Sequence, residues 1–210
     1  MEILGRLFGS PARVKIIRLF VFNPRIAYEL TDIVKRTKVP EKIVRAEIVG
    51  LRSAGLIKTK TFYKDVIEKR GKSKVVVRRR VKGIVLEEKF PYLQALSSFL
   101  INASPVKETD VLKRLSGVGK LKFVAIAGIF LKDFESRLDI LVVGDKLKRR
   151  LLERAIRRLE SEIGREIRFA VFSSNDFKYR LSVYDRLIRD VLDYPHLAVV
   201  DRFGITESSK

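Results

Sequence analysis

Cysteine is absent from this chain of 210 residues. Its absence excludes disulfide bonds, thiol catalysis and zinc sites built on thiolates. No run of 18 apolar residues exists either, so no transmembrane helix is expected. The first residues also lack the apolar core of a signal peptide. We therefore expect a cytoplasmic protein with no membrane partner.

Acidic residues are few: 25 Asp and Glu stand against 45 Lys and Arg, giving a formal charge of +20. Since 46% of the residues are hydrophobic, the charge is not a sign of disorder. A surplus of this size predicts a polyanionic partner, foremost nucleic acid. The residues up to Ser104 carry +14 of the charge and those from Pro105 carry +6. The N-terminal half is therefore the stronger candidate for binding the polyanion.

Three helices are predicted in the first 55 residues. Ser10-Pro11 suits the start of the first helix, and Asn23-Pro24 ends it. The second is expected over residues 28–35, followed by a turn at residues 37–39. Pro40 begins the third helix and Gly55 ends it. Helical spacing predicts that the third helix buries Ile43, Val44, Ile48 and Leu51.

A hairpin is predicted directly after the third helix. Residues 56–63 alternate as a half-buried strand should, and residues 75–77 form the return strand. Between them, Gly71 and Ser73 sit among basic residues, as expected of a loop that lies along phosphates. Arg78-Arg79-Arg80 breaks the alternation, so this segment is expected to form a bulge or to leave the sheet.

Helix, turn, basic helix and basic hairpin follow one another in the order of a winged helix-turn-helix, which we assign to residues 1–84. Helix-turn-helix domains insert the start of the second helix of the motif into the major groove. Lys42 and Arg45 are therefore the candidates for base contacts, and Lys38 for a phosphate contact. The predicted double-stranded DNA-binding residues are Lys38, Lys42, Arg45, Arg52, Lys69, Arg70, Lys72 and Lys74. Two alternatives are that these cations only form the solvated face of a helix, and that the partner is RNA.

Residues 85–104 are expected to connect two domains through a helix that starts at Phe90-Pro91. Apolar residues recur along it at helical spacing. Two interpretations are open for this apolar face. It either packs on the first helix as core or joins two copies of the chain in a homodimer.

From residue 105 to residue 210 helices alternate with apolar strands, which predicts an α/β domain with a mixed sheet. The expected strands are residues 121–126, 138–143, 167–172 and 197–200. Leu115-Ser116-Gly117-Val118-Gly119-Lys120 resembles the hairpin of helix-hairpin-helix DNA binders. The apolar residues after it predict a strand, which argues against that motif.

Gly128-Ile129 and the later run Ser136-Arg137-Leu138-Asp139, followed by apolar residues, resemble the nucleotidyltransferase superfamily, in particular its minimal members. The resemblance covers about residues 121–200. It implies a Gly-Ser pair that holds nucleotide phosphates and two carboxylates that hold the catalytic metals.

The chain departs from that pattern where the chemistry needs it. Ile129 stands at the family's serine and Arg137 at its first carboxylate, so only Gly128 and Asp139 match. Strand 167–172 offers Arg168 and no third acid. We therefore expect a vestigial, catalytically inactive site with no metal and no cofactor, where Arg137 could attract a small anionic ligand. Asp133 and Glu135 are the only candidates to replace the lost acids.

The predicted fold class is α+β, with an N-terminal winged helix-turn-helix and a C-terminal α/β nucleotidyltransferase-like domain. The predicted function is sequence-specific regulation of transcription by a dimer. The C-terminal domain is expected to serve dimerisation or sensing and not to be an enzyme. The alternative is an active, antitoxin-like nucleotidyltransferase that carries a DNA-binding domain.

Overall fold

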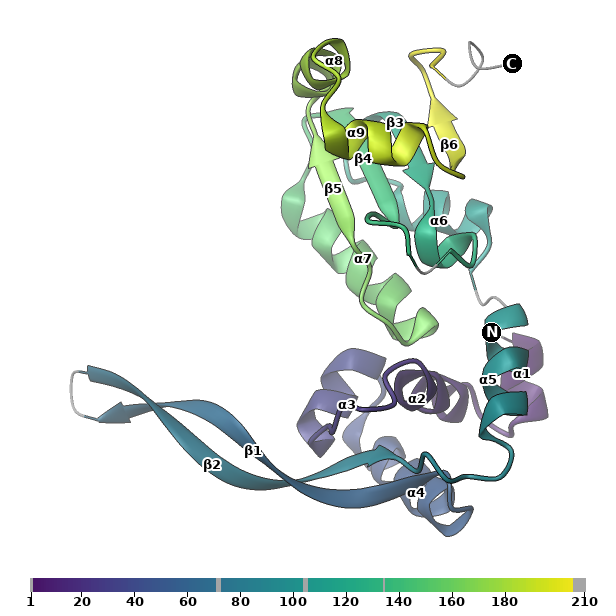
Figure 1. Cartoon of the computed structure of the whole chain (residues 1–210), viewed down its shortest axis with the longest axis vertical. Coiled ribbons are helices and arrows are strands. Elements are labelled where there is room, and N and C mark those ends of the chain that lie inside the picture. The colour runs from purple at the N-terminus through teal and green to yellow at the C-terminus, as the bar shows by residue number, and fades with distance from the viewer. Residues whose placement is uncertain (1, 71–72, 104–105, 134, 206–210) are drawn as a thin grey trace. The chain divides into compact units, whose positions relative to one another are not determined.

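The structure is a computed structural model that describes residues 2–70, 73–103, 106–133 and 135–205. Over these residues it is a mixed α and β protein with nine α-helices and two sheets (Figure 1). The chain divides into two compact units, residues 1–102 with 161–165, and residues 103–160 with 166–210. None of the helices described is long and apolar enough to cross a membrane.

Unit 1 contains five helices that are complete within it, and one two-stranded antiparallel sheet. Its elements are α1 (Glu2–Leu7), α2 (Pro11–Val21), α3 (Leu30–Thr37), α4 (Glu41–Ser53), β1 (Ile57–Arg70), β2 (Ser73–Leu86) and α5 (Leu93–Asn102). Ser10 caps α2 through its side chain, which accepts from the backbone N–H of Arg13 at 3.0 Å. Gly55 follows α4 with a φ of +80°, which suits glycine after a helix end.

The predicted second helix begins two residues late, at Leu30. Tyr28, expected to be helical, instead pairs with Ile84 as a short antiparallel bridge beside β2. The two residues exchange backbone hydrogen bonds of 2.9 and 2.8 Å. This pairing extends the base of the hairpin to a third strand position and ties the start of α3 to the sheet.

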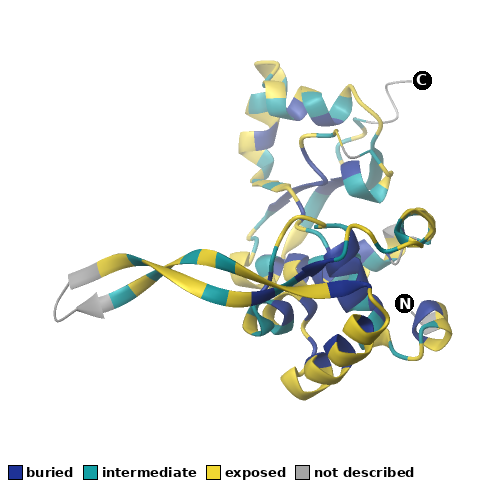
Figure 2. Cartoon of the chain, turned by 60° about the horizontal axis from the view of Figure 1, so that its bottom comes forward, coloured by how far each residue is buried: buried dark blue, intermediate teal, exposed yellow. Residues whose placement is uncertain are grey.

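The hairpin is longer and more regular than the sequence indicated. Each strand has 14 residues, and their register runs unbroken from Ile57↔Leu86 to Arg70↔Ser73. Arg78, Arg79 and Arg80 pair with Asp65, Lys64 and Tyr63. The expectation of a bulge or of a departure from the sheet at these arginines was wrong. Alternation fails there because Arg78, Arg79 and Arg80 are all exposed, as are most residues beyond the base of the ribbon (Figure 2).

Helix α5 packs on the core of unit 1. Leu100 is buried, and Leu93 and Leu96 lie against the cluster formed by α2, α3, α4 and the base of the hairpin. Phe99 is partly exposed and meets Phe8 with ring centroids 6.2 Å apart. The interpretation of this helix as core packing is therefore confirmed for one of its faces. The dimer interpretation stays a prediction.

Unit 2 holds a four-stranded mixed sheet in the order β5-β4-β3-β6. Its elements are α6 (Glu108–Leu115), β3 (Lys120–Ile126), a short 3-10 helix (Gly128–Phe130), β4 (Ile140–Asp145), α7 (Arg149–Ile163), β5 (Phe169–Phe172), α8 (Ser174–Ser182), α9 (Arg186–Leu192) and β6 (Leu197–Asp201). Only β4 and β5 run parallel. The expected strands are thus all present, although two begin two residues late, because Leu138-Asp139 and Ile167-Arg168 precede the ladder.

The centre of this sheet is buried. All four residues from Ile140 to Val143 are buried, so both faces of β4 are covered. Phe177 of α8 and Ile188 of α9 contribute to the core on one face. Phe177 stacks on Phe123 of β3, with ring centroids 5.5 Å apart. Gly128, just after β3, and Asp139, just before β4, are therefore positioned by two paired and largely buried strands.

Candidate nucleic-acid interface and the Asp139 cluster

The outer face of α4 carries the predicted base-contacting residues. Lys42, Arg45 and Arg52 are all exposed, as is Lys38 in the turn before the helix. Val49, at 58% exposure, lies on the same face, because positions 42, 45, 49 and 52 follow helical spacing. Lys38 adopts a left-handed conformation with a φ of +57° and makes the sharp turn between α3 and α4. One helix face therefore presents cations around an apolar side chain.

Arg45 forms an ion pair within α4. Its guanidinium donates to the Glu41 carboxylate one turn earlier, at 2.6 and 2.9 Å. Both side chains are more than half exposed, so this pair contributes little to stability and can open at little cost. Lys42 and Arg52, in contrast, form no ion pair with any residue that the structure describes.

The buried face of α4 differs from the predicted one at two positions. Ile43, expected inside, is 44% exposed, and Glu47 takes the buried place among Val44, Ile48 and Leu51. The Glu47 carboxylate accepts from the Arg13 guanidinium at 2.7 Å and from the Ser10 hydroxyl at 2.8 Å. Since Ser10 also caps α2, this network fixes α4 to the start of α2.

The hairpin is anchored to the rest of unit 1 as far out as Lys64, in the middle of β1. The ammonium of Lys64 on β1 donates to Asp32 and lies 3.2 Å from the Glu29 carboxylate beside α3. These hydrogen bonds, first the one to Asp32 and then the one to Glu29, raise the pKa of Lys64. At Gly83 a Cβ would collide with the Phe62 ring and come within 2.9 Å of the Tyr28 carbonyl oxygen. Close contact of β1, β2 and the Tyr28 bridge therefore requires glycine here.

The distal part of the hairpin holds the predicted phosphate-contacting cations. Lys72 lies outside the described residues. For Lys69, Arg70 and Lys74 the structure describes the backbone, whose register places Lys69 opposite Lys74. At about 3.3 Å per residue, each strand spans about 45 Å. Lys69, Arg70 and Lys74 therefore lie near the far end of a hairpin whose strands are longer than a helical turn of duplex DNA, about 34 Å.

Apolar side chains are also exposed on the hairpin. Ile67 and Val76 pair across the strands and are 67% and 65% exposed. Close to them, Arg79 is paired with Glu68 at 2.7 Å, and the guanidinium of Arg78 lies 5.2 Å from the centroid of the Tyr63 ring. Sequence reasoning did not single out this pair, although the valine run at residues 75–77 was a signal.

In unit 2, Asp139 is completely buried and its carboxylate is occupied by four hydrogen bonds. The Arg168 guanidinium donates to both oxygens at 3.1 Å, and the backbone N–H of Arg168 donates at 2.8 Å. The backbone N–H of Ile129 supplies the fourth bond at 3.0 Å. The hydrogen bond with Asp139 also raises the pKa of Arg168. A carboxylate bound in this way has no oxygen turned toward solvent for a metal.

Gly128 lies directly against this carboxylate. Its φ is +54°, and a Cβ at this position would collide with an Asp139 oxygen. The glycine therefore serves the close approach of two chain segments. Sequence reasoning placed Gly128, Asp139 and Arg168 near one another, but it did not foresee that Arg168 would occupy the aspartate.

Arg137, which stands at the family's first carboxylate and was expected to attract an anion, has a carboxylate partner. Arg137 lies 3.0 Å from the Asp190 carboxylate of α9, and its side chain is 58% exposed. Asp133 and Glu135 lie close enough to Arg168 to act on its charge. In the part of the chain that the structure describes, no three acidic or histidine side chains come together as metal ligands.

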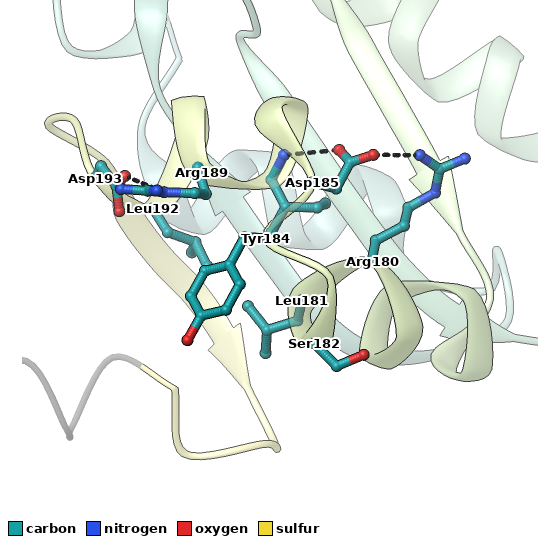
Figure 3. Close-up of a pocket in the computed structure, with 9 residues that line it drawn as sticks. Arg180, Leu181, Ser182, Tyr184, Asp185, Arg189, Leu192 and Asp193 are labelled. Carbon is teal, nitrogen blue, oxygen red and sulfur yellow. Dashed lines mark hydrogen bonds and ion pairs between the residues drawn. The ribbon is translucent and has the colours of Figure 1, made fainter.

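A cavity of about 430 Å³ lies between α8 and α9 (Figure 3). Two of its arginines are paired with carboxylates, Arg180 with Asp185 at 2.7 Å and Arg189 with Asp193 at 2.9 Å. Tyr184 lines it with a φ of +55° and a largely exposed side chain. Because its arginine charges are balanced within the cavity, it offers no net charge to attract an ion.

No protein-family model matches this chain, and the searches of curated proteins and of solved structures also find no match.

Proposed function

We propose that this protein binds double-stranded DNA through a winged helix-turn-helix in unit 1 and regulates transcription. The observation that carries the proposal is that two surfaces suited to DNA occur together in unit 1. One is the exposed face of α4, and the other is a basic hairpin anchored to the rest of the unit. A helix of 13 residues, about 20 Å long, fits a major groove about 12 Å wide.

The exposed residues of α4 are suited to contacts with base edges, as distinct from contacts with phosphates. Lys42 and Arg45 lie near the start of the helix, where groove-binding helices read base edges. Arginine binds guanine through two hydrogen bonds, so Arg45 would exchange Glu41 for a base. The exposed Val49 and Ile43 suit contact with thymine methyl groups. We therefore assign sequence choice to α4.

The hairpin supports affinity. From Ile57 to Leu86 it carries 11 basic and two acidic residues. The register of β1 and β2 places the backbone of Lys69 opposite that of Lys74 near the far end of the hairpin. Phosphates attract such cations without regard to sequence. We therefore assign the general, salt-dependent part of binding to Lys69, Arg70, Lys72 and Lys74, together with Lys38 and Arg52.

Unit 2 is proposed to be a nucleotidyltransferase-like module without catalytic activity that serves dimerisation or sensing. The four hydrogen bonds to Asp139 support this proposal, since they leave the one matching carboxylate unavailable to a metal. They count against the alternative of an active nucleotidyltransferase. A dimer is proposed because palindromic operators match two-fold symmetric proteins.

Selection of duplexes from a random pool by the full-length protein tests the function. We expect enrichment of a defined sequence that protects a footprint on DNA. The variant Arg45→Ala should enrich less strongly, whereas Arg150→Ala, an exposed cation on α7, should enrich as the wild type does. Equal retention of all duplexes would contradict sequence-specific recognition.

A further inference from the structure

A second cavity in unit 2, of about 520 Å³, opens where α6 turns into β3. Gly117 and Gly119 of the turn line it, together with Lys120, Lys122 and Arg202. It lies at the beginning of β3, whereas Gly128 and Asp139 lie beyond the end of that strand. It is therefore a different place from the one that the nucleotidyltransferase resemblance points to.

Local backbone geometry builds this cavity. Gly117 and Gly119 have φ values of +80° and +153°, and a Cβ on Gly119 would come within 2.8 Å of the Lys146 carbonyl oxygen. Between them, Val118 is buried and accepts from the Lys148 N–H at 2.7 Å. The buried Val118 and its hydrogen bond thus fix the turn. The backbone of the two glycines lines the cavity, and the lack of a side chain permits close approach of a ligand.

A strand irregularity places the second lysine. Between Leu121 and Phe123 the register with β4 shifts by one residue, so Lys122 is the extra residue of a bulge. Bulges of this kind redirect a side chain out of the regular alternation. The backbone N–H of Arg202 donates to the Lys122 carbonyl oxygen at 2.9 Å and sets the two residues side by side.

All the charged residues that line this cavity are basic. Lys120, Lys122 and Arg202 are accompanied by no acidic residue among those that line the cavity. One nearby acid is Asp145, the cross-strand partner of Lys120, and its carboxylate accepts from the Ser174 N–H at 3.3 Å. Hydrogen bonding with Ser174 and, to a smaller extent, the two lysines lower the pKa of Asp145. The cavity between α8 and α9 differs, because its two arginines have carboxylate partners within it.

We propose that this cavity binds a phosphorylated small molecule, with its phosphate groups on Lys120, Lys122 and Arg202 beside the glycine turn. Its volume lies within the range of about 300–1,000 Å³ found for small-molecule sites. Cations and glycine backbone together form the usual surroundings of a bound phosphate. The site does not depend on the proposed DNA binding, which resides in unit 1.

Calorimetry of the full-length protein with pyrophosphate and with ATP, at about 0.15 M salt and without metal, tests the site. Salt at this level screens loose association with the protein's net charge. Loss of two charge-assisted contacts should weaken binding at least about tenfold in Lys122→Ala/Arg202→Ala. The control Arg150→Ala/Lys82→Ala removes equal charge elsewhere and should change affinity less than about twofold, which is within the effect of exposed charges. Equal losses in both variants, or no binding by the wild type, would overturn the proposal.

Amide NMR spectra provide a second measure that does not depend on affinity. Pyrophosphate should shift the N–H signals of Gly117, Gly119 and Lys120 and leave those of Gly128 and Ile129 in place. Shifts spread over all basic surfaces would overturn the site. A duplex titration separates the two sources of phosphate. If the double variant lost duplex binding but kept pyrophosphate binding, the cavity would belong to the DNA backbone and the small-molecule proposal would fail.

Discussion

The arginines of α4 and the arginine beside Asp139 show two opposite uses of the same side chain. On α4, Arg52 has no acidic partner among the described residues, and Arg45 has only an exposed one. In unit 2, Arg168 is bound through Nε and Nη2 to a carboxylate with no exposure to solvent. The first kind of cation is available to an external anion, and the second neutralises a charge of the fold.

This difference shows what net charge does and does not predict. Both halves of the chain are basic, and a count of residues would assign both to nucleic acid. Whether a cation is available to nucleic acid depends on its partner in the fold, because a cation already bound to a buried carboxylate gains little from a phosphate. This difference between the two kinds of arginine can be tested in two ways. One removes the available cations of unit 1, and the other removes the buried carboxylate of Asp139.

The largest effect is expected from the tip of the hairpin. Replacing Lys69, Arg70, Lys72 and Lys74 together by alanine should weaken duplex binding on the order of 10³-fold at about 0.1 M salt, since four phosphate contacts are lost. Unfolding should be nearly unchanged, because the described core of unit 1 draws on β1 and β2 near the base of the hairpin, at Ile57, Ile84 and Leu86. Anisotropy titrations with labelled duplex measure the loss. Wild-type affinity in the fourfold variant would show that the hairpin does not touch DNA.

Asp139→Ala should affect unit 2 alone. The change leaves two backbone N–H groups without their acceptor, which costs about 2–3 kcal/mol in the free energy of unfolding. Arg168, itself partly exposed, can return to solvent and adds little to the cost. Chemical denaturation measures the cost, with Asp193→Ala as the matched control, because Asp193 forms an exposed pair with Arg189. DNA affinity should stay within about twofold, and a large loss would mean that unit 2 takes part in binding.

Arg45→Ala should cost about 1–3 kcal/mol on the preferred duplex and little on random duplexes. Lys72→Ala should weaken binding to both kinds of duplex alike, because phosphate contacts carry no sequence information. The two variants are compared on one specific and one random duplex. Identical behaviour would remove the assigned division between base and phosphate contacts.

Local signals in the sequence predicted much of the fold. Ser10, Pro40 and Gly55 lie where helices begin and end, since caps depend only on neighbouring residues. Contacts between distant residues were not visible. Glu47 is buried because Ser10 and Arg13, more than 30 residues away, satisfy it, and Ile43 is displaced to the surface.

The candidate site in unit 2 shows the same limit. The sequence identified Asp139 as the one carboxylate of the pattern that remains, and Arg168 as the residue at the position of a lost acid. It could not show that the two bind each other, because 29 residues separate them. It also could not show that Arg137, expected to attract an anionic ligand, pairs with Asp190.

The smallest effect is expected in an assay of nucleotidyl transfer. Label from nucleoside triphosphate should pass neither to protein nor to RNA with magnesium or manganese, because Asp139 is occupied and the other acids are missing. The double variant Arg137→Asp/Arg168→Asp restores carboxylates at both places and serves as a sensitive comparison. Transfer by the wild type that disappears in Asp139→Asn would revive the enzyme alternative.

The salt dependence of duplex binding tests most directly whether the cations of unit 1 meet phosphates. With about five of the six assigned cations in contact with phosphates, log K against log salt concentration should fall with a slope of roughly −4 to −5. The fourfold hairpin variant should reduce the slope to about −1, whereas Asp139→Ala should leave it unchanged. A flat titration of the wild type would contradict the account.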